Sequence, residues 1–337
     1  MVKRMNLIDV IKGIMIVFVI ITHFHFAYPD DYRRFGFFYY IDMAMPVFMI
    51  ISGYLTTLSF ERNRIDNIKK AWSVKYIVPK LLRFIIPFTI MYIIELPDLI
   101  LIKGYSIGLV TQLFFDGGVG PGAYYTPVMI QLIFMAPVIN WIIKKYDLRG
   151  VLYCFLFTAI YEAGSYCLGL PSDVYRMLAF RYVSLFSFGC FIAIGKKRIN
   201  RYMLTLLFLI GIVWQTALNY IPLHPILMNQ DWARVNYLSS LFVFPVMYLL
   251  IPKATNSNLT LHPLQDVGKA SYNIFLVQMF FYSSRLSASV YDSVKSRTLQ
   301  LMLCILFCTL VGYLFYIFEN RLTSRIIKAI RKNNLAE

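Results

Sequence analysis

A succession of long apolar segments, separated by short polar loops, is the feature that most limits what this chain can fold into. Apolar residues make up 59% of the 337 residues and charged residues only 15%, a composition typical of integral membrane proteins. Because a helix needs about 20 apolar residues to cross a bilayer, the sequence predicts an all-α, polytopic membrane bundle of about ten transmembrane helices. We expect these spans at residues 5–27, 37–59, 81–102, 124–143, 151–168, 178–195, 202–220, 236–252, 270–284 and 299–318.

The basic residues are concentrated in alternate loops between these spans. The net charge is +16, and most of the 33 Lys and Arg residues fall on one side of the expected bilayer. They include Lys3, Arg4, Arg62, Arg64, Lys69, Lys70, Lys144, Lys145, Lys196, Lys197, Arg198, Arg321 and Arg325. Since cytoplasmic loops carry an excess of Lys and Arg, this asymmetry predicts that both termini are cytoplasmic. Because this distribution of positive charge is explained by membrane topology, it does not indicate a surface that binds DNA or RNA. We therefore expect no nucleic-acid partner.

The loops between the spans are too short to form a domain of their own. The longest, at 60–80, 103–123 and 253–269, cannot bury a hydrophobic core. We therefore expect a single transmembrane domain over residues 1–337, with no soluble domain. The 5 Cys residues all lie in apolar segments without paired loop spacing, so neither a disulfide framework nor a metal site is expected.

Three ionisable residues, Asp9, Lys12 and His23, lie within or at the edge of the first apolar segment. Ionisable groups are costly in hydrocarbon, so each is expected to face the protein interior or a water-filled cavity. At about 100° per residue the three share one helix face, with about 16 Å along the axis between Lys12 and His23. His25 lies about 160° from His23 around the helix, so at most one of the two belongs to this face. Histidine acts as base and acid near neutral pH, which makes His23 the leading catalytic candidate.

An alternative interpretation requires no chemistry at this face. Asp9 and Lys12 are three residues apart, so they can form an ion pair along one helix. His23 can form a hydrogen bond to a neighbouring helix. The sequence places no second and third ligand near His23, as a bound metal would need.

A basic cluster precedes the third span. Lys80 and Arg83 are three residues apart at the start of this helix, and Lys75 lies shortly before them. One cation here would anchor the helix at the membrane surface, whereas several cations at a helix N-terminus suit a polyanionic ligand. Both interpretations, anchoring and ligand binding, stay open.

Small residues interrupt two other parts of the chain. Ser52 and Gly53 lie in the second span, where small side chains usually permit close helix packing but equally let a ligand approach the backbone. The glycine-rich stretch 117–122 follows no strand and lies outside by the expected topology, so it does not predict a phosphate-binding loop. We interpret it as a flexible lid or a re-entrant entrance to the fourth span.

Polar residues within the other spans are further candidates. Glu162 lies toward the outer end of the fifth span. A buried carboxylate is expensive in a membrane, so Glu162 is a functional candidate, with a place at the outer interface as the alternative. The remaining polar or aromatic candidates are Tyr124, Tyr125, Gln131 and Gln278.

The order and spacing of these motifs resemble the membrane-bound acyltransferase 3 family, over essentially the whole chain. The family opens with an Asp, a basic residue and a His eleven positions later, which correspond here to Asp9, Lys12 and His23. The family's run ending in Ser-Gly-Tyr matches residues 48–54, and its basic cluster before the third span matches Lys80 and Arg83. Residues 125–137 are similar to the family's fourth span and residues 271–276 to its ninth.

Two positions depart from the family pattern. Lys12 replaces the usual arginine, which keeps the charge but loses the bidentate geometry of a guanidinium. Gln278 replaces the usual histidine of the ninth-span motif, which removes a titratable group and puts an acid–base role there in doubt.

The resemblance implies an O-acetyltransferase of a bacterial-type plasma membrane. Cytoplasmic acetyl-CoA would be the donor, and the acceptor would be a sugar hydroxyl of a surface polysaccharide or its lipid-linked precursor. His23 would activate that hydroxyl or carry the acetyl group transiently, and Lys12 would anchor the donor or orient Asp9. Donor-binding residues would be Lys75, Lys80, Arg83, Ser52 and Gly53. Acceptor-binding residues would be Tyr124, Tyr125, Gln131, Glu162 and Gln278.

A proton-coupled transporter or exporter of a lipidic or acylated solute is the alternative function. Intramembrane Asp, Lys and His residues also mark proton relays. The sequence shows no internal repeat of the kind many transporters have, and the Lys80 and Arg83 pair suits CoA phosphates better. The small residues Gly189, Ala193 and Gly195 can pack within the chain or between copies, which leaves a homo-oligomer open.

Overall fold

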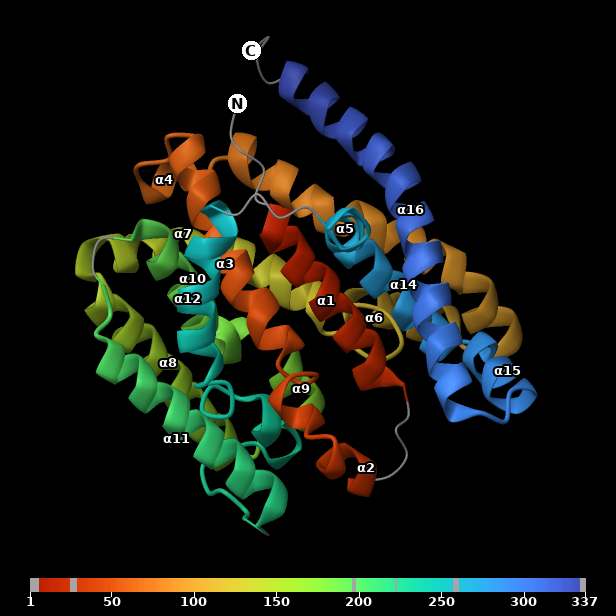
Figure 1. Cartoon of the computed structure of the whole chain (residues 1–337). Coiled ribbons are helices and arrows are strands. Elements are labelled where there is room, and N and C mark those ends of the chain that lie inside the picture. The colour runs from red at the N-terminus through yellow and green to blue at the C-terminus, as the bar shows by residue number, and fades with distance from the viewer. Residues whose placement is uncertain (1–5, 25–28, 196–197, 222, 257–260, 334–337) are drawn as a thin grey trace. The chain divides into compact units, whose positions relative to one another are not determined.

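The structure, a computed structural model, describes residues 6–24, 29–195, 198–221, 223–256 and 261–333. Every regular element within these residues is a helix, and Figure 1 shows their order along the chain. The predicted all-α class is therefore confirmed. Five residues of the predicted charge pattern and helix face lie outside the described residues: Lys3, Arg4, His25, Lys196 and Lys197.

Six helical segments of the described chain are long and apolar enough to cross a membrane. They are Asn6–His23, Phe37–Arg62, Val74–Ile102, Tyr125–Tyr146, Arg201–Tyr220 and Arg297–Ile330. Two shorter apolar segments, Ala179–Ile194 and Val243–Lys253, coincide with the sixth and eighth expected spans. Helices α8 (Leu148–Cys167) and α14 (Ser271–Ser283) occupy the fifth and ninth. The count of ten transmembrane helices and the cytoplasmic side of the termini stay predictions.

Local sequence signals set several helix boundaries. The side chain of Asn200 accepts a hydrogen bond from the backbone N–H of Tyr202 and caps α11 (Arg201–Tyr220). Ser106 caps α6 (Ile107–Phe115) in the same way, at the backbone N–H of Leu109. Helix α10 (Val183–Ile194) ends at Gly195, whose φ of +60° is the left-handed conformation that stops a helix.

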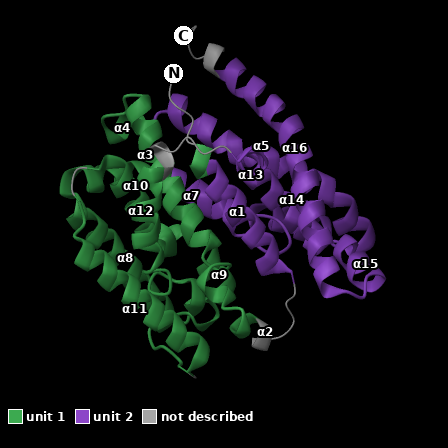
Figure 2. Ribbon diagram, viewed as in Figure 1, with its two compact units in different colours: residues 1–8, 26–72, 134–260 green, residues 9–25, 73–133, 261–337 purple. Residues whose placement is uncertain are grey.

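The chain divides into two compact units, coloured in Figure 2. Unit 1 comprises residues 1–8, 26–72 and 134–260, and unit 2 comprises residues 9–25, 73–133 and 261–337. Besides α8, α10 and α11, unit 1 holds α2 (Pro29–Arg34), η1 (Phe37–Tyr39), α3 (Ala44–Arg62), α4 (Ile68–Ala71), α9 (Ser172–Met177), η3 (Ala179–Tyr182), η4 (Gln230–Val235) and α12 (Val243–Asn256). Besides α6 and α14, unit 2 holds most of α1 (Asn6–His23), and α5 (Val74–Pro97), η2 (Asp98–Ile102), α13 (His262–Lys269), α15 (Arg285–Ser293) and α16 (Arg297–Asn333). The residues of α7 (Tyr125–Tyr146) are divided between the two units.

Two glycines bring α3 and α10 of unit 1 into backbone contact. A Cβ atom at Gly53 would lie 2.0 Å from the carbonyl oxygen of Phe186, and one at Gly189 would lie 1.9 Å from that of Ile50. Neither position has room for a side chain, which is the reason for small residues at such a crossing. Gly189 therefore packs within the chain, and a homo-oligomer stays a prediction.

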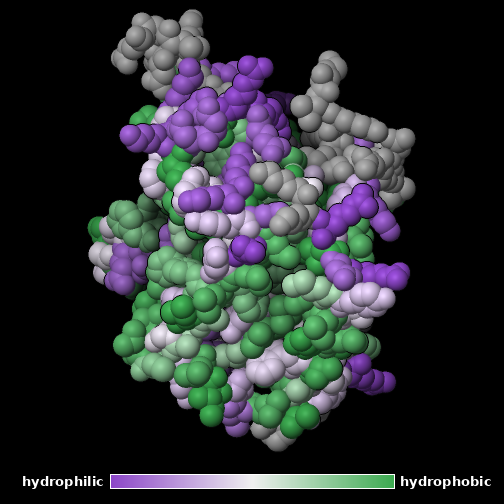
Figure 3. All heavy atoms as spheres, turned by 90° about the vertical axis from the view of Figure 1, so that its left-hand side faces the viewer, coloured by the Kyte–Doolittle hydropathy of each residue, from purple (hydrophilic) through white to green (hydrophobic). Residues whose placement is uncertain are grey.

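Exposed apolar side chains cover α8 and α11 in unit 1. They include Leu152, Leu156, Ile160, Leu206, Leu209 and Val213. Figure 3 shows a broad apolar surface on this side, with hydrophilic residues gathered toward one end. Soluble proteins rarely expose so continuous an apolar surface, whereas lipid-facing helices do so by necessity.

Candidate functional site

Helix α1 carries the three ionisable residues of the first span on one continuous helix. Asp9 lies in its first turn and His23 is its last residue. The Nζ atom of Lys12 lies 3.3 Å from Oδ1 of Asp9, and the two side chains are 20% and 18% exposed. The ion pair of the alternative interpretation is therefore present, and a catalytic role for Asp9 and Lys12 stays a prediction. The ion pair lies near the N-terminal end of α1. The imidazole of His23 lies at the C-terminal end, about 16 Å from Lys12 along the axis.

Helix α13 covers the charged end of α1, a contact that the sequence did not predict. A Cβ atom at Gly268 would lie 1.7 Å from the carbonyl oxygen of Asp9, and one at Gly13 would lie 2.2 Å from that of Leu264. The two backbones are thus in direct contact. The sequence signal for this contact is the amphipathic pattern of residues 262–269, which places Leu264 and Gly268 one turn apart on the same helix face.

His23 is half-buried and lies beside Tyr282 of α14. Their ring centroids are 6.5 Å apart and the planes meet at 64°, an edge-to-face arrangement. The hydroxyl of Tyr282 donates a hydrogen bond of 3.0 Å to the carbonyl oxygen of Ile20. Helix α14 therefore holds the last turn of α1, the turn that carries His23. Tyr282 was missed from the sequence because a contact between distant helices leaves no local pattern.

The glycine-rich stretch 117–122, called here the glycine loop, packs against α14 within unit 2. A Cβ atom at Gly120 would lie 2.6 Å from the carbonyl oxygen of Met279, and one at Gly122 would lie 2.7 Å from the ring of Phe275. The φ angles of Gly120 and Gly122 are +101° and +93°, which side chains rarely allow. The loop is thus a packed element in this structure, and its interpretation as a lid stays a prediction.

Gln278 of α14 lies fully buried next to the glycine loop. It has 0% exposure, and its Nε2 donates a hydrogen bond of 3.1 Å to the carbonyl oxygen of Pro121. Its Oε1 atom has no hydrogen-bond partner among the described residues. A predicted acceptor-binding residue is therefore adjacent to the predicted lid.

Tyr124 and Tyr125 follow the glycine loop and are both buried. The ring of Tyr125 lies 4.8 Å from that of Phe275 and 6.0 Å from that of Tyr272, both on α14. The hydroxyl of Tyr272 donates a hydrogen bond of 3.0 Å to the carbonyl oxygen of Phe84 on α5. Gln131 is half-buried further along α7. The aromatic candidates thus form part of the packing between α5, α7 and α14 in unit 2.

Lys75, Lys80 and Arg83 lie along the first turns of α5, within about 12 Å of helix. Lys75 and Arg83 are exposed, and Lys80 is half-buried with its Nζ atom 4.3 Å from the ring centre of Tyr76. The third span was expected to start at residue 81, but α5 begins at Val74, so only Lys75 lies in its first turn, where the helix dipole favours phosphate. Binding of the donor by these three cations stays a prediction. In the part of the chain that the structure describes, no three His, Cys, Asp or Glu side chains are grouped to hold a metal ion.

A buried carboxylate that the sequence analysis missed joins α14 to α16. Glu319 is 7% exposed. Its Oε2 atom accepts a hydrogen bond of 3.1 Å from Nδ2 of Asn273, and its Oε1 atom accepts one from the hydroxyl of Thr323. Glu319 directly follows the last apolar segment and precedes the basic tail, a position at which a carboxylate is ordinarily solvated.

Glu162 belongs to a buried cluster of unit 1. It is 1% exposed, and its Oε1 accepts a hydrogen bond of 2.5 Å from the hydroxyl of Tyr175. Burial raises the pKa of the Tyr175 phenol, so this group keeps its proton and donates. The guanidinium of Arg181 lies 5.5 Å from the ring centre of Tyr175 and 4.5 Å from that of Trp232. Glu162 thus lies in the interior of unit 1, and a role in acceptor binding stays a prediction.

Ser52 and Gly53 also lie in unit 1, where Ser52 is half-buried. The space beside Gly53 is taken by the backbone of Phe186. Close helix packing, one of the two predicted interpretations, therefore accounts for the glycine. Donor binding by Ser52 and Gly53 stays a prediction.

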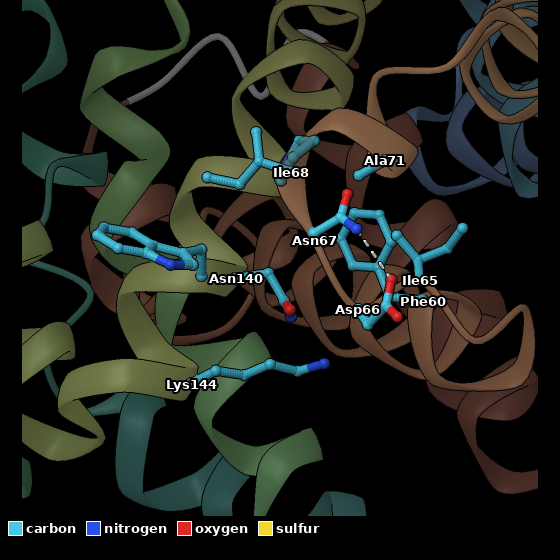
Figure 4. A pocket seen from close by; sticks show the side chains of 10 residues that line it. Phe60, Ile65, Asp66, Asn67, Ile68, Ala71, Asn140 and Lys144 are labelled. Atoms are coloured by element: carbon cyan, nitrogen blue, oxygen red, sulfur yellow. Dashed lines mark hydrogen bonds between the residues drawn. The ribbon is translucent and has the colours of Figure 1, made fainter.

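A pocket of unit 1 lies between the α3–α4 connection and the second half of α7, as Figure 4 shows. Its lining residues are Phe60, Ile65, Asp66, Asn67, Ile68, Ala71, Pro137, Asn140, Trp141 and Lys144. Asn140 donates a hydrogen bond of 2.7 Å to the hydroxyl of Thr57, and Asn67 donates one of 3.3 Å to Asp66. None of the residues predicted to bind donor or acceptor lines this pocket.

A family model described as an acyltransferase domain, that of acyltransferase 3, matches residues 5–317. The chain belongs to the acyltransferase 3 family. No curated protein and no solved structure matches the chain. The matched range runs from the start of α1 into α16, so it contains every predicted site residue of this acyltransferase 3 protein. The resemblance drawn from the motifs is confirmed.

Family membership and the six long apolar helices make this acyltransferase 3 protein a multi-pass membrane acyltransferase. The general predictions of an acyltransferase and of a transmembrane protein are confirmed. The acetyl group, the CoA donor and the sugar acceptor are finer statements and belong to the proposal below.

Proposed function

We propose that this acyltransferase 3 protein transfers an acetyl group from cytoplasmic acetyl-CoA to a sugar hydroxyl of a surface polysaccharide or its lipid-linked precursor. The observation that carries the proposal is the arrangement on α1, where the Asp9–Lys12 ion pair and His23 lie at opposite ends of one apolar helix. With the termini in the cytoplasm, the ion pair lies toward the donor side and His23 toward the acceptor side.

The donor is held by cations on α5. Acetyl-CoA carries several phosphate charges, and Lys75, Lys80 and Arg83 offer three cations within about 12 Å of helix. Arg83 is exposed, and a guanidinium is the side chain best suited to a bidentate contact with phosphate oxygens. Lys12 either anchors the donor or keeps Asp9 oriented, as the 3.3 Å ion pair supports.

His23 acts at the reacting atoms, by one of two chemical routes for acetyl transfer. In direct transfer, the acceptor oxygen attacks the acetyl carbonyl carbon while His23 removes the hydroxyl proton. The carbon–sulfur bond breaks, the new carbon–oxygen bond forms, and the CoA thiolate takes up the proton from His23. In the covalent route, the His23 ring first attacks the acetyl carbonyl carbon, the carbon–sulfur bond breaks and CoA leaves as its thiolate. The acceptor oxygen then attacks the same carbon and displaces the neutral ring, and the hydroxyl proton passes to solvent.

The acceptor binds near the candidates of unit 2. Tyr124, Tyr125, Gln131 and Gln278 supply aromatic faces and amide groups, the side chains that commonly contact sugar rings and hydroxyls. Glu162 is buried against Tyr175 in unit 1, so it is the acceptor candidate that the structure supports least.

The test is transfer of label from radiolabelled acetyl-CoA in membrane vesicles of known orientation. Wild type and His23→Ala are compared with crude glycan and lipid-linked sugar fractions as acceptors. We expect label in a glycan or lipid fraction with wild type only, and equal thermal unfolding of the two proteins. Normal transfer by His23→Ala would remove His23 from the mechanism. Absence of transfer by wild type with every fraction would reject the proposed function.

A further inference from the structure

The side-chain amide of Gln278 has a fixed orientation. The carbonyl oxygen of Pro121 can only accept a hydrogen bond, so the amide nitrogen of Gln278 has to face it, at 3.1 Å. The other polar atom of the amide, Oε1, faces away from Pro121. Within the described residues Oε1 has no hydrogen-bond partner. A buried acceptor without a donor is unfavourable and calls for an explanation.

The glycine loop builds this arrangement. Because Gly120 and Gly122 have positive φ angles and no Cβ, the loop backbone lies directly on Met279 and Phe275 of α14. A Cβ atom at Gly122 would also lie 3.8 Å from Nε2 of Gln278. The carbonyl of Pro121 between these two glycines is therefore held in place, and it sets the direction of Oε1.

Gln278 is also close to the turn that contacts His23. Tyr282 lies four residues later on α14, so the two side chains share a helix face about 6 Å apart along the axis. Tyr282 is the residue whose ring lies 6.5 Å from that of His23. The unsatisfied oxygen thus belongs to the helix face that reaches the proposed reacting group.

Resting on the proposed acetyl transfer, we infer that Oε1 of Gln278 accepts a hydrogen bond from a second hydroxyl of the acceptor, beside the one that is acetylated. The acceptor is therefore a polyol such as a sugar ring, and a simple alcohol is a poor substrate. Since Oε1 is buried, binding of the acceptor requires movement of the side chains around it, while the hydrogen bond from Nε2 to the carbonyl of Pro121 is kept. Gln278 determines specificity, and Pro121 orients it.

The test uses the full-length protein in oriented vesicles, radiolabelled acetyl-CoA, and glycan fragments that wild type labels. Each fragment is compared with analogues in which one hydroxyl is replaced by hydrogen. We expect one deoxy position to lower kcat/KM of wild type about tenfold, the effect of losing one neutral hydrogen bond. Gln278→Leu should lower kcat/KM for the parent fragment by a similar factor. This variant should no longer distinguish the parent fragment from that deoxy analogue, so the effects of the substitution and of the missing hydroxyl are not additive.

A matched control comes from another amide of unit 2. Gln300 donates hydrogen bonds to the carbonyl oxygens of Tyr291 and Val294, at 3.1 and 2.6 Å. Gln300→Leu should lower stability without changing the preference among deoxy analogues. Gln278→Met, which is unbranched, replaces Gln278→Leu if the latter does not fold.

Three outcomes separate the hypotheses. If wild type labels glycans and the Gln278 and deoxy effects add fully, the role of Gln278 is wrong while the proposed function stands. A loss of acetyl-CoA affinity in Gln278→Leu equal to its loss of transfer would place Gln278 on the donor side and also overturn the inference. No labelling by wild type rejects the proposed function and this inference with it.

Discussion

The carbonyl oxygen of Asp9 lies so close to Gly268 that a Cβ atom at position 268 would be only 1.7 Å away from it. Two helices far apart in the sequence, α1 and α13, are therefore in backbone contact beside the Asp9–Lys12 ion pair. The environment of this pair depends on α13 as well as on α1.

Gly268→Ala is expected to destabilise the protein, because its methyl group would collide with the backbone of Asp9. Overpacking of this kind costs about 1–3 kcal/mol. Thermal or chemical unfolding in detergent measures the loss. The control is Gly108→Ala in α6, where no atom of the described residues lies within 4 Å of the new Cβ, so stability should stay equal or rise by up to about 1 kcal/mol. Equal unfolding of Gly268→Ala and wild type would contradict the close contact.

Tyr282→Phe is expected to lower the free energy of unfolding by about 1 kcal/mol, because it removes the hydrogen bond to the carbonyl of Ile20. The ring that contacts His23 remains, so acetyl transfer should stay within a few-fold of wild type. Tyr282→Ala also removes the ring, and we expect it to lower transfer by about tenfold or more through a displaced His23. Label transfer and unfolding are measured for both variants. Equal transfer rates in Tyr282→Ala and Tyr282→Phe would contradict a role of the ring in positioning His23.

Glu319→Leu is expected to lower the free energy of unfolding, whereas Glu319→Gln should be tolerated. The carboxylate of Glu319 accepts hydrogen bonds from Nδ2 of Asn273 and from the hydroxyl of Thr323. A glutamine can accept from Asn273 with its oxygen and donate to the Thr323 hydroxyl with its nitrogen, because a hydroxyl also accepts. A leucine leaves the buried amide of Asn273 without this acceptor, at a cost of about 1–3 kcal/mol. Unfolding in detergent measures both variants, and an equal loss of stability in the two would contradict the network.

Lys12→Met is expected to reduce acetyl transfer by about tenfold or more, because it removes the positive charge of the partly buried ion pair with Asp9. Lys12→Arg keeps the positive charge and should retain most of the activity. Initial rates of label transfer at saturating acetyl-CoA compare the three proteins. Equal loss in the Arg and Met variants would mean that the shape of lysine, and not its charge, is what matters.

Length and apolar composition were sufficient to predict the positions of most helices, since they reflect what a bilayer requires of each segment. Boundaries were less predictable where a side chain competes with the helix. The eighth span was expected from residue 236, but α12 begins at Val243. The Oδ1 atom of Asn236 accepts hydrogen bonds from the backbone N–H groups of Leu238 and Ser239, which favours a turn there.

Features that lie on one helix were the most predictable. The i,i+3 spacing of Asp9 and Lys12 allowed the ion pair that the structure shows. The face that these residues share with His23 stays a prediction. The contacts of Tyr282, Gly268 and Glu319 were not predictable, because they join segments that are distant in sequence. An apolar helix gives no local sign of which neighbour it packs against.

The division of unit 2 into three chain segments has a consequence for biosynthesis. Residues 9–25 are synthesised well before their partners in residues 261–337. During most of translation the nascent α1 therefore enters the membrane with its ion pair and its glycine at position 13 not yet covered by α13. The part of α1 that α13 covers therefore has other neighbours until residues 261–337 are made. A ribosome that stalls before residue 261 would leave a product in which α1 is inserted but unit 2 cannot assemble.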